Sequence, residues 1–392
     1  MKTLTFLAVL SLALNAFAAE LPSQDISLLK EVDRAQARGL DWLAKQQESD
    51  GSWRHHPAIT GLAVTAFLRS GQPLSADQQT AVNRAIAFIL TNVRTNGAIY
   101  GANRIDQYPN YSTAICIMTL MATGNPAYTG VIRNARAFLL NTQFDETHHT
   151  GHAEANYGGM GYGSDERADL SNTAWALEAL RLTESLQTRA TDSPHIDTDL
   201  HWQKAVAFLQ RCQNLPARND QSWSKQAGDR DLGGFVYRPG FSFANAGVTE
   251  EDEDKDSLGA TPLRSYGSMS YAGLKSYIYA DLKKDDPRVA GAVQWLRKNY
   301  TVDENPGLGT QGLYYYYHTM AKALTVYGDD VFTDAAGRKH DWRYELMNKL
   351  VSLQKLDGFW VNDNNRWWEN DPVLVTSYSL LSLEIARARH YP

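Results

Sequence analysis

The fold is decided by a short stretch of sequence, QESDGSW at residues 47–53, which returns near the other end of the chain as QKLDGFW at residues 354–360. Both copies read Gln-x-x-Asp-Gly-x-Trp. In each copy an apolar segment with helical spacing ends at the Gln, the Asp-Gly pair permits a tight turn, and the Trp offers a large surface for burial. We interpret the motif as structural: it joins two helices and holds them together, and it takes no direct part in chemistry.

The two motifs belong to a helix-pair repeat that runs through the chain. A first helix ends in an apolar or aromatic segment and a turn, and a second helix follows with a small hydroxyl residue near its start. The second helices align on Thr60, Thr113, Thr173, Ser270, Thr319 and Thr376. The helix pairs span about residues 36–71, 80–124, 132–185, 200–282, 288–328 and 342–388.

The second helix of each pair is apolar around more of its circumference than the first, which indicates burial on two sides. The sequence therefore predicts an all-α fold, a closed α6/α6 toroid of six inner and six outer helices joined by short Gly-rich, hairpin-like loops. An open superhelix of helix pairs is the alternative, but its concave face would not need such apolar inner helices. Because no Pro-, Ser- or Gly-rich linker interrupts the chain, residues 19–392 are predicted to form one domain.

The first 18 residues are predicted to be a cleaved signal peptide. Lys2 precedes an apolar run, and Ala16 and Ala18 supply a small-residue cleavage site. The run is too short to cross a bilayer, and no later stretch is long enough. We expect the protein to be exported, periplasmic or extracellular, without a transmembrane segment; a buried N-terminal helix is the alternative.

Charge and cysteine content exclude some classes of protein. The net charge of −6 and the lack of a basic stripe argue against a nucleic-acid partner. Cys116 and Cys212 are the two cysteines, and both fall on apolar helix faces. Buried free thiols are therefore expected, with a disulfide as the alternative.

On this repeat the sequence resembles the squalene cyclase and protein prenyltransferase superfamily, whose hallmark is a Gln-to-Trp motif repeated on a ring of helix pairs. The resemblance covers about residues 30–388. It implies that a ligand binds in the central cavity, near the N-terminal ends of the inner helices. Because the same ring serves unrelated reactions, the resemblance says little about the chemistry.

One motif of that superfamily is altered here. Class II terpene cyclases carry Asp-x-Asp-Asp-Thr-Ala, in which the middle Asp protonates an alkene or an epoxide. The matching stretch is DLSNTA at residues 169–174, where Ser171 and Asn172 replace the two later Asp residues. A serine hydroxyl cannot protonate an alkene. Asp169 stays a candidate acid if it is buried and protonated, and the alternative is that it caps the inner helix.

A second motif is also incomplete. Protein prenyltransferases bind zinc through Asp-x-Cys at one inner helix and His-Thr at the next. His318 and Thr319 are similar to the latter, but the Asp-x-Cys positions read Ser-Met-Ser at residues 268–270, so no metal or cofactor is predicted. His318 is either an acid, base or hydrogen-bonding group facing the cavity, or a satisfied core histidine. The acidic run at residues 249–257 is interpreted as a solvated loop, with weak calcium binding as the alternative.

We therefore predict a terpenoid-cyclase-like toroid that binds an isoprenoid or other apolar ligand in an aromatic central cavity and that could act as an isomerase or lyase. Asp169 and His318 are the predicted catalytic residues. The predicted ligand-binding residues are Tyr111, Asn172, Trp175, Tyr266, Tyr317, Arg264 and Trp367. Aromatic faces among them can stabilise a carbocation.

Two other functions stay open at this point. The toroid can be a non-catalytic binding or scaffold protein. It can also be a secreted polysaccharide lyase or hydrolase, which would bind carbohydrate and would need Asp169, Glu369 and Asp371 to face one polar cleft.

Overall fold

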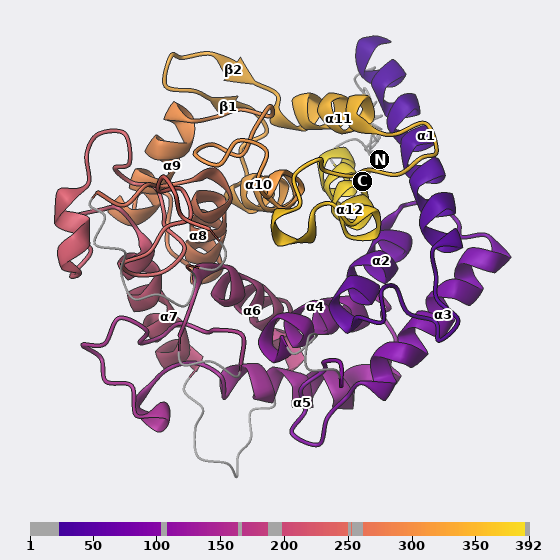
Figure 1. The fold of residues 1–392 in the computed structure, drawn as a ribbon, viewed down its shortest axis with the longest axis horizontal. Coiled ribbons are helices and arrows are strands. Elements are labelled where there is room, and N and C mark those ends of the chain that lie inside the picture. The colour runs from indigo at the N-terminus through magenta and orange to yellow at the C-terminus, as the bar shows by residue number, and fades with distance from the viewer. Residues whose placement is uncertain are drawn as a thin grey trace, which may run out of the picture.

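The computed structural model describes residues 23–102, 108–163, 167–186, 198–249, 252 and 262–388. Helices dominate these residues, so the predicted all-α class is confirmed (Figure 1). The predicted signal peptide lies outside the described residues, as does most of the acidic run at 249–257. None of the described helices combines the length and the apolar composition that crossing a membrane requires.

The inner helices stand side by side around the centre of the molecule (Figure 1). They are α2 (Pro57–Arg69), α4 (Pro109–Ala122), α6 (Leu170–Leu182), α8 (Gly267–Tyr279), α10 (Leu313–Tyr327) and α12 (Pro372–Arg387). Each contacts the next, and α12 contacts α2. The ring is therefore closed, and the open superhelix is excluded.

The outer helices alternate with the inner ones along the chain. They are α1 (Ser23–Lys45), α3 (Ala76–Thr91), α5 (Thr129–Leu140), α7 (Thr198–Cys212), α9 (Pro287–Lys298) and α11 (Trp342–Leu353). Burial differs between the layers as the sequence predicts. The inner helix α2 buries every residue from Pro57 to Phe67, whereas α3 buries only one face, which includes Ala81, Ala85 and Ile89.

The connections carry little regular structure. One antiparallel pair, β1 (Phe332–Thr333) and β2 (Lys339–His340), joins α10 to α11. Short 3-10 helices lie at η2 (Pro126–Tyr128), η3 (Glu146–His148), η4 (Glu184–Leu186), η5 (Ser222–Gln226) and η7 (Arg366–Trp368). Isolated bridges such as Val93 with Ile99 give some loops the predicted hairpin-like form. The connection between α7 and α8, residues 213–266, is long, so the prediction of short loops is wrong there.

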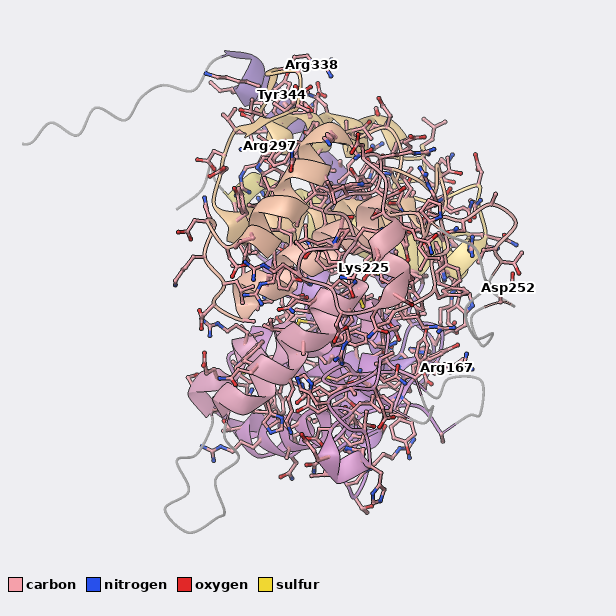
Figure 2. All side chains as sticks on the ribbon, turned by 90° about the vertical axis from the view of Figure 1, so that its left-hand side faces the viewer. Arg167, Lys225, Asp252, Arg297, Arg338 and Tyr344 are labelled. Atoms are coloured by element: carbon pink, nitrogen blue, oxygen red, sulfur yellow. The ribbon has the colours of Figure 1, made fainter. Side chains whose placement is uncertain are left out.

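Residues from the N-terminal ends of the inner helices line one cavity, so these ends lie together. Arg167, just before α6, and Asp252, in the connection from α7 to α8, both lie towards the right-hand edge of Figure 2. The N-terminal ends of the inner helices and the loops that lead into them therefore share this end.

The Gln of the opening motif links neighbouring repeats. The side-chain amide of Gln354 donates one hydrogen bond to the carbonyl of Gly358 in its own turn (2.7 Å) and another to the carbonyl of Ala35 in α1 (2.8 Å). The same pair of bonds, to its own turn and to the next outer helix, is made by Gln47, Gln143 and Gln213. The structural interpretation of the motif is confirmed.

The Gly and the Trp of the motif fix the same joint. Gly358 has a φ of 97°, and a Cβ there would lie 2.8 Å from the carbonyl oxygen of Arg38 in α1, so a larger residue does not fit. Trp360 is fully buried, and its indole N–H donates to the carbonyl of Leu350 (2.7 Å). Its backbone N–H donates to the hydroxyl of Thr376 (3.0 Å).

The hydroxyl residues on which the inner helices align repeat this last contact. In four further repeats the hydroxyl accepts the backbone N–H of the residue two places after the turn glycine. The hydroxyl residues in these repeats are Thr60, Thr113, Thr173 and Ser270. Thr319 differs, since its hydroxyl donates to the carbonyl of Tyr315 in its own helix. Cys116 and Cys212 are buried and free, as predicted.

Candidate active site in the ring centre

A cavity of about 260 Å³ lies at the N-terminal ends of the inner helices, and we call it the aromatic cavity. Most of its wall is made of rings: His56, Tyr108, Tyr111, Tyr162, Tyr237, Tyr266, Tyr315, Trp367, Trp368 and Tyr378. Apolar side chains complete the wall: Ala58, Ile59, Leu62, Ile115, Met269 and Leu374. The polar groups that remain are Ser171, Ser268 and Glu369.

The rings of this wall contact one another edge to face or at a tilt. Tyr108 lies with its ring centre 5.1 Å from that of Tyr162 and 6.3 Å from that of Trp368. The hydroxyls of Tyr111 and Tyr378 lie 3.3 Å apart. Burial raises the pKa of Tyr315 to about 12, and the pKa of Tyr111 is also raised well above its usual value by burial. These phenols are therefore neutral, and their faces present negative potential without a full charge.

Glu369 is the one carboxyl group among the described residues that line this wall. It is 1% exposed. One carboxylate oxygen, Oε1, accepts the backbone N–H of Tyr315 in the first turn of α10 (2.8 Å), and the other, Oε2, accepts the side-chain amide of Asn362 (2.7 Å). Trp367 and Trp368, with φ of 53° and 61°, form the left-handed turn that leads the chain to this position.

The environment of Glu369 keeps its carboxyl group protonated up to about neutral pH. Burial raises the pKa of the carboxyl to about 7, although the N–H groups of Tyr315, Tyr314 and Leu313 and the amide of Asn362 oppose the shift. A group with such a pKa is a carboxylic acid below pH 7 and can donate a proton. The helix N–H groups can then hold the carboxylate that is left behind.

A second cavity, of about 300 Å³, lies at the C-terminal ends of the inner helices, and we call it the C-terminal cavity. It shares the side chains of Leu62 and Ile115 with the aromatic cavity, so the two lie one above the other along the ring axis. Its wall carries the charged groups Arg69, Glu178, Arg181 and Lys322.

His318 lines the C-terminal cavity. Its ring stacks on Trp175 at 5.8 Å and lies 5.5 Å from the ring of Tyr378. Within the described part of the chain, neither ring nitrogen has a hydrogen-bond partner. Burial, together with the positive charge of Lys322, lowers the pKa of His318 well below its usual value, so the imidazole is neutral.

The chain is similar to known cyclases in both sequence and fold. Residues 56–228 match the family model of the squalene-hopene cyclase C-terminal domain. The apo form of the type II terpene cyclase MstE from Scytonema has a similar structure, with a TM-score of 0.52 at 11% identity over 92% of this chain and 99% of that one. The chain has the fold of the squalene cyclase-like terpenoid cyclase superfamily.

Two further structures of the cyclase MstE, both of variants, support this fold. One is a complex with the substrate geranylgeranyl dihydroxybenzoate, with a TM-score of 0.53 at 12% identity over 93% of this chain and 99% of that one. The other is a complex with the product merosterolic acid A, with a TM-score of 0.50, 12% identity and the same coverage. No curated protein matches the chain in sequence. The family model and the cyclase structures confirm, at the level of the superfamily, the resemblance that the sequence predicts.

In this terpenoid cyclase-like toroid, Asp169 is a helix cap. Its two carboxylate oxygens accept the backbone N–H (2.8 Å) and the side-chain amide (2.7 Å) of Asn172 in α6. Neither Asp169 nor Asn172 is among the described residues that line the two cavities. Ser171, at the place of the middle Asp of the cyclase motif, does line the aromatic cavity, and its hydroxyl lies 3.0 Å from that of Tyr315.

The other predicted site residues are divided between the cavities and the rest of the toroid. Those that line the aromatic cavity are Tyr111, Tyr266 and Trp367. Trp175 and His318 line the C-terminal cavity instead. Tyr317 donates its hydroxyl to the carbonyl of Val302 (2.8 Å), and the guanidinium of Arg264 pairs with Asp231 (3.0 Å), so both are engaged away from the two cavities.

From the sequence, Glu369 was a candidate only for the polysaccharide-cleaving alternative, and the toroid places it in the aromatic cavity together with Tyr315 and Tyr378. The only sequence signal for Glu369 is its place in RWWENDP, residues 366–372, just before an inner helix. Within the described residues, no three His, Cys, Asp or Glu side chains gather as a metal site would require.

Proposed function

We propose that this chain is a terpenoid cyclase-like enzyme that binds a short isoprenoid in the aromatic cavity, where Glu369 protonates it and starts an isomerisation or cyclisation. One observation carries the proposal: among the described residues of the aromatic cavity, one buried carboxyl group, whose pKa burial raises to about 7, faces a wall that is otherwise mainly aromatic and apolar. The complexes of MstE with a geranylgeranyl substrate support the choice of ligand class.

In the proposed reaction the O–H bond of Glu369 breaks and a C–H bond forms at one carbon of an alkene. The positive charge on the neighbouring carbon lies against aromatic faces such as those of Tyr108 and Tyr111, which stabilise it. The carboxylate, held by the N–H of Tyr315 and the amide of Asn362, then takes a proton from an adjacent carbon. An isomer leaves, and the acid is restored without an added reactant.

The size of the cavity limits the ligand. A volume of about 260 Å³ lies at the lower end of the range of about 300–1,000 Å³ that is typical of small-molecule pockets. It therefore favours a short isoprenoid, such as geraniol, or one end of a longer chain.

Two further parts of the proposal rest on the sequence. The signal-like residues 1–18 favour export, so the ligand would be one that is present outside the cytoplasm. Of the three carboxylates that a polysaccharide-cleaving site would need, Glu369 lines the aromatic cavity, whereas Asp169 caps α6 and Asp371 pairs with Arg54 (2.7 Å). This arrangement favours the isoprenoid over the carbohydrate.

Filling one cavity at a time tests the ligand site. Leu374 and Leu381 both lie on α12, but Leu374 lines the aromatic cavity and Leu381 lines the C-terminal cavity. We expect Leu374→Trp to abolish binding of geraniol, measured by isothermal titration calorimetry, and Leu381→Trp to leave it unchanged. Both changes insert the same bulk, so the cost of overpacking is matched at about 1–3 kcal/mol. Equal binding by the two variants, or no binding by the wild-type protein, would contradict the proposed site.

A further inference from the structure

The C-terminal cavity holds an unbalanced set of buried charges. The carboxylate of Glu178 pairs with the ammonium of Lys275 (2.6 Å) and with that of Lys322 (2.8 Å). The side chains are 12%, 4% and 14% exposed, respectively. Two cations thus share one anion, and one positive charge in the group is left without a full counter-charge.

The pKa values in this cluster reflect that imbalance. Burial alone would raise the pKa of Glu178, but Lys275 and Lys322 outweigh it and hold the pKa below its usual range. Burial lowers the pKa of Lys322 to about 8, and the nearby charge of Lys275 adds to the effect although Glu178 opposes it. The ammonium of Lys322 also lies 4.5 Å above the ring of Trp175, a contact that only partly replaces an anion.

The other charged groups around the cluster do not remove the excess. Arg69 is exposed at the rim of the cavity. Arg181 is already paired with Asp281 (3.0 Å) and Glu184 (3.1 Å). Glu384 is another carboxyl group close to Arg69 and Lys322, and burial raises its pKa to about 7, so it is largely neutral below that pH.

The rest of the wall is apolar. Leu62, Ile115, Met118, Leu381 and Ile385 line the cavity beside the charged groups. A ligand that satisfies the whole wall therefore needs an apolar chain as well as an anionic end. A small hydrophilic anion would pair with the cations but would leave these side chains uncovered.

We propose that the C-terminal cavity binds an amphiphile with a single carboxylate, whose carboxylate pairs with Lys322 and Arg69 and whose chain lies along Met118, Leu381 and Ile385. The charged group and the apolar wall carry this assignment together. It does not depend on the isoprenoid reaction proposed for the aromatic cavity, from which Leu62 and Ile115 separate it.

Calorimetric titration with decanoate tests the proposal, with decanol and acetate as matched probes for the apolar chain alone and the carboxylate alone. The wild-type protein is expected to bind decanoate, and to bind each of the other two at least about tenfold more weakly. Lys322→Met, which keeps the aliphatic stem, is expected to weaken decanoate binding by about tenfold or more. Lys322→Arg is expected to retain it.

Further variants keep the test decisive if Lys322→Met does not fold. Arg69→Gln changes an exposed side chain and is also expected to weaken decanoate binding, whereas Lys283→Met, at an exposed lysine that does not line the cavity, is not. Leu381→Trp should block decanoate while Leu374→Trp leaves it bound, the reverse of the pattern for geraniol. Equal affinity for decanoate and decanol, equal affinity for decanoate and acetate, no binding of decanoate, or unchanged binding by Arg69→Gln would overturn the proposal.

Discussion

Replacing Glu369 by Gln is expected to slow the turnover of geraniol by about 10²–10⁴-fold, the usual contribution of a general acid. Gln keeps the shape of the side chain and a carbonyl oxygen that can accept the N–H of Tyr315, but it has no proton to give to an alkene. Affinity for geraniol should therefore change little while the rate collapses. Product formation followed by gas chromatography, together with calorimetric binding, separates the two effects.

Asp169→Asn is the matched control for this experiment. Asn is as good a helix N-cap as Asp, so a residue that only caps α6 tolerates the change, whereas a proton donor does not. We expect Asp169→Asn to retain most of the wild-type rate. If Asp169→Asn stopped the reaction and Glu369→Gln did not, the acid would be Asp169, as the comparison of cyclase motifs first suggested.

Replacing Trp360 by Ala is expected to cost about 3–5 kcal/mol of stability, as for other fully buried aromatic side chains. Trp360 fills the joint where the last repeat meets the first, and a Cβ on Gly39 of α1 would lie 2.8 Å from its ring. The variant therefore leaves a cavity, and it also loses the indole hydrogen bond to the carbonyl of Leu350. The free energy of unfolding, measured by urea denaturation, gives the cost.

Trp42 provides the comparison for that measurement. It lies on α1 and stacks on Phe359 at 5.0 Å, but it is only partly buried. Trp42→Ala should therefore cost much less than Trp360→Ala, because less apolar surface returns to water. A cost for Trp360→Ala that does not exceed the cost for Trp42→Ala would mean that the motif does not hold the ring closed.

The ring itself could be predicted because it results from local contacts that recur from repeat to repeat. Gln354, Gly358 and Trp360 each make a contact that depends only on their spacing from the turn, and the same spacing occurs at Gln47, Gly51 and Trp53. The hydroxyls at Thr60 and Thr376 likewise bond to the residue two places after the turn glycine. A pattern of this kind is visible in the sequence before the partners of each residue are known.

The site could be predicted only in part. The side of an inner helix that faces the centre, and the cavity that a residue reaches along that helix, depend on tertiary packing and not on the local sequence. Tyr315 and Tyr317 are two residues apart on α10, which turns them to different sides: Tyr315 faces the aromatic cavity and Tyr317 bonds to Val302. The inner helices are buried on most sides, so burial pattern does not identify the side that faces the centre. Trp175 and His318 lie deeper along their helices and reach the C-terminal cavity.

Glu369 was not predicted as the acid of an isoprenoid site for a different reason. It lies in an irregular loop, where periodicity gives no information, and its carboxylate meets the first turn of α10, a helix that precedes it in the chain by more than forty residues. Its role as a cap and its raised pKa both follow from that tertiary contact. Asp169, by contrast, caps the helix that it directly precedes, as the alternative interpretation of the sequence held.

Turnover of geraniol in D₂O tests the central claim most directly. If Glu369 donates a proton to carbon, the product carries deuterium in a new C–D bond, detected by mass spectrometry. The rate should fall as pH rises through about 7, the pKa of Glu369, because the acid is the active form and is lost by ionisation. A product without deuterium on carbon, a rate that rises with pH over that range, or no product at all would contradict an acid-initiated reaction in the aromatic cavity.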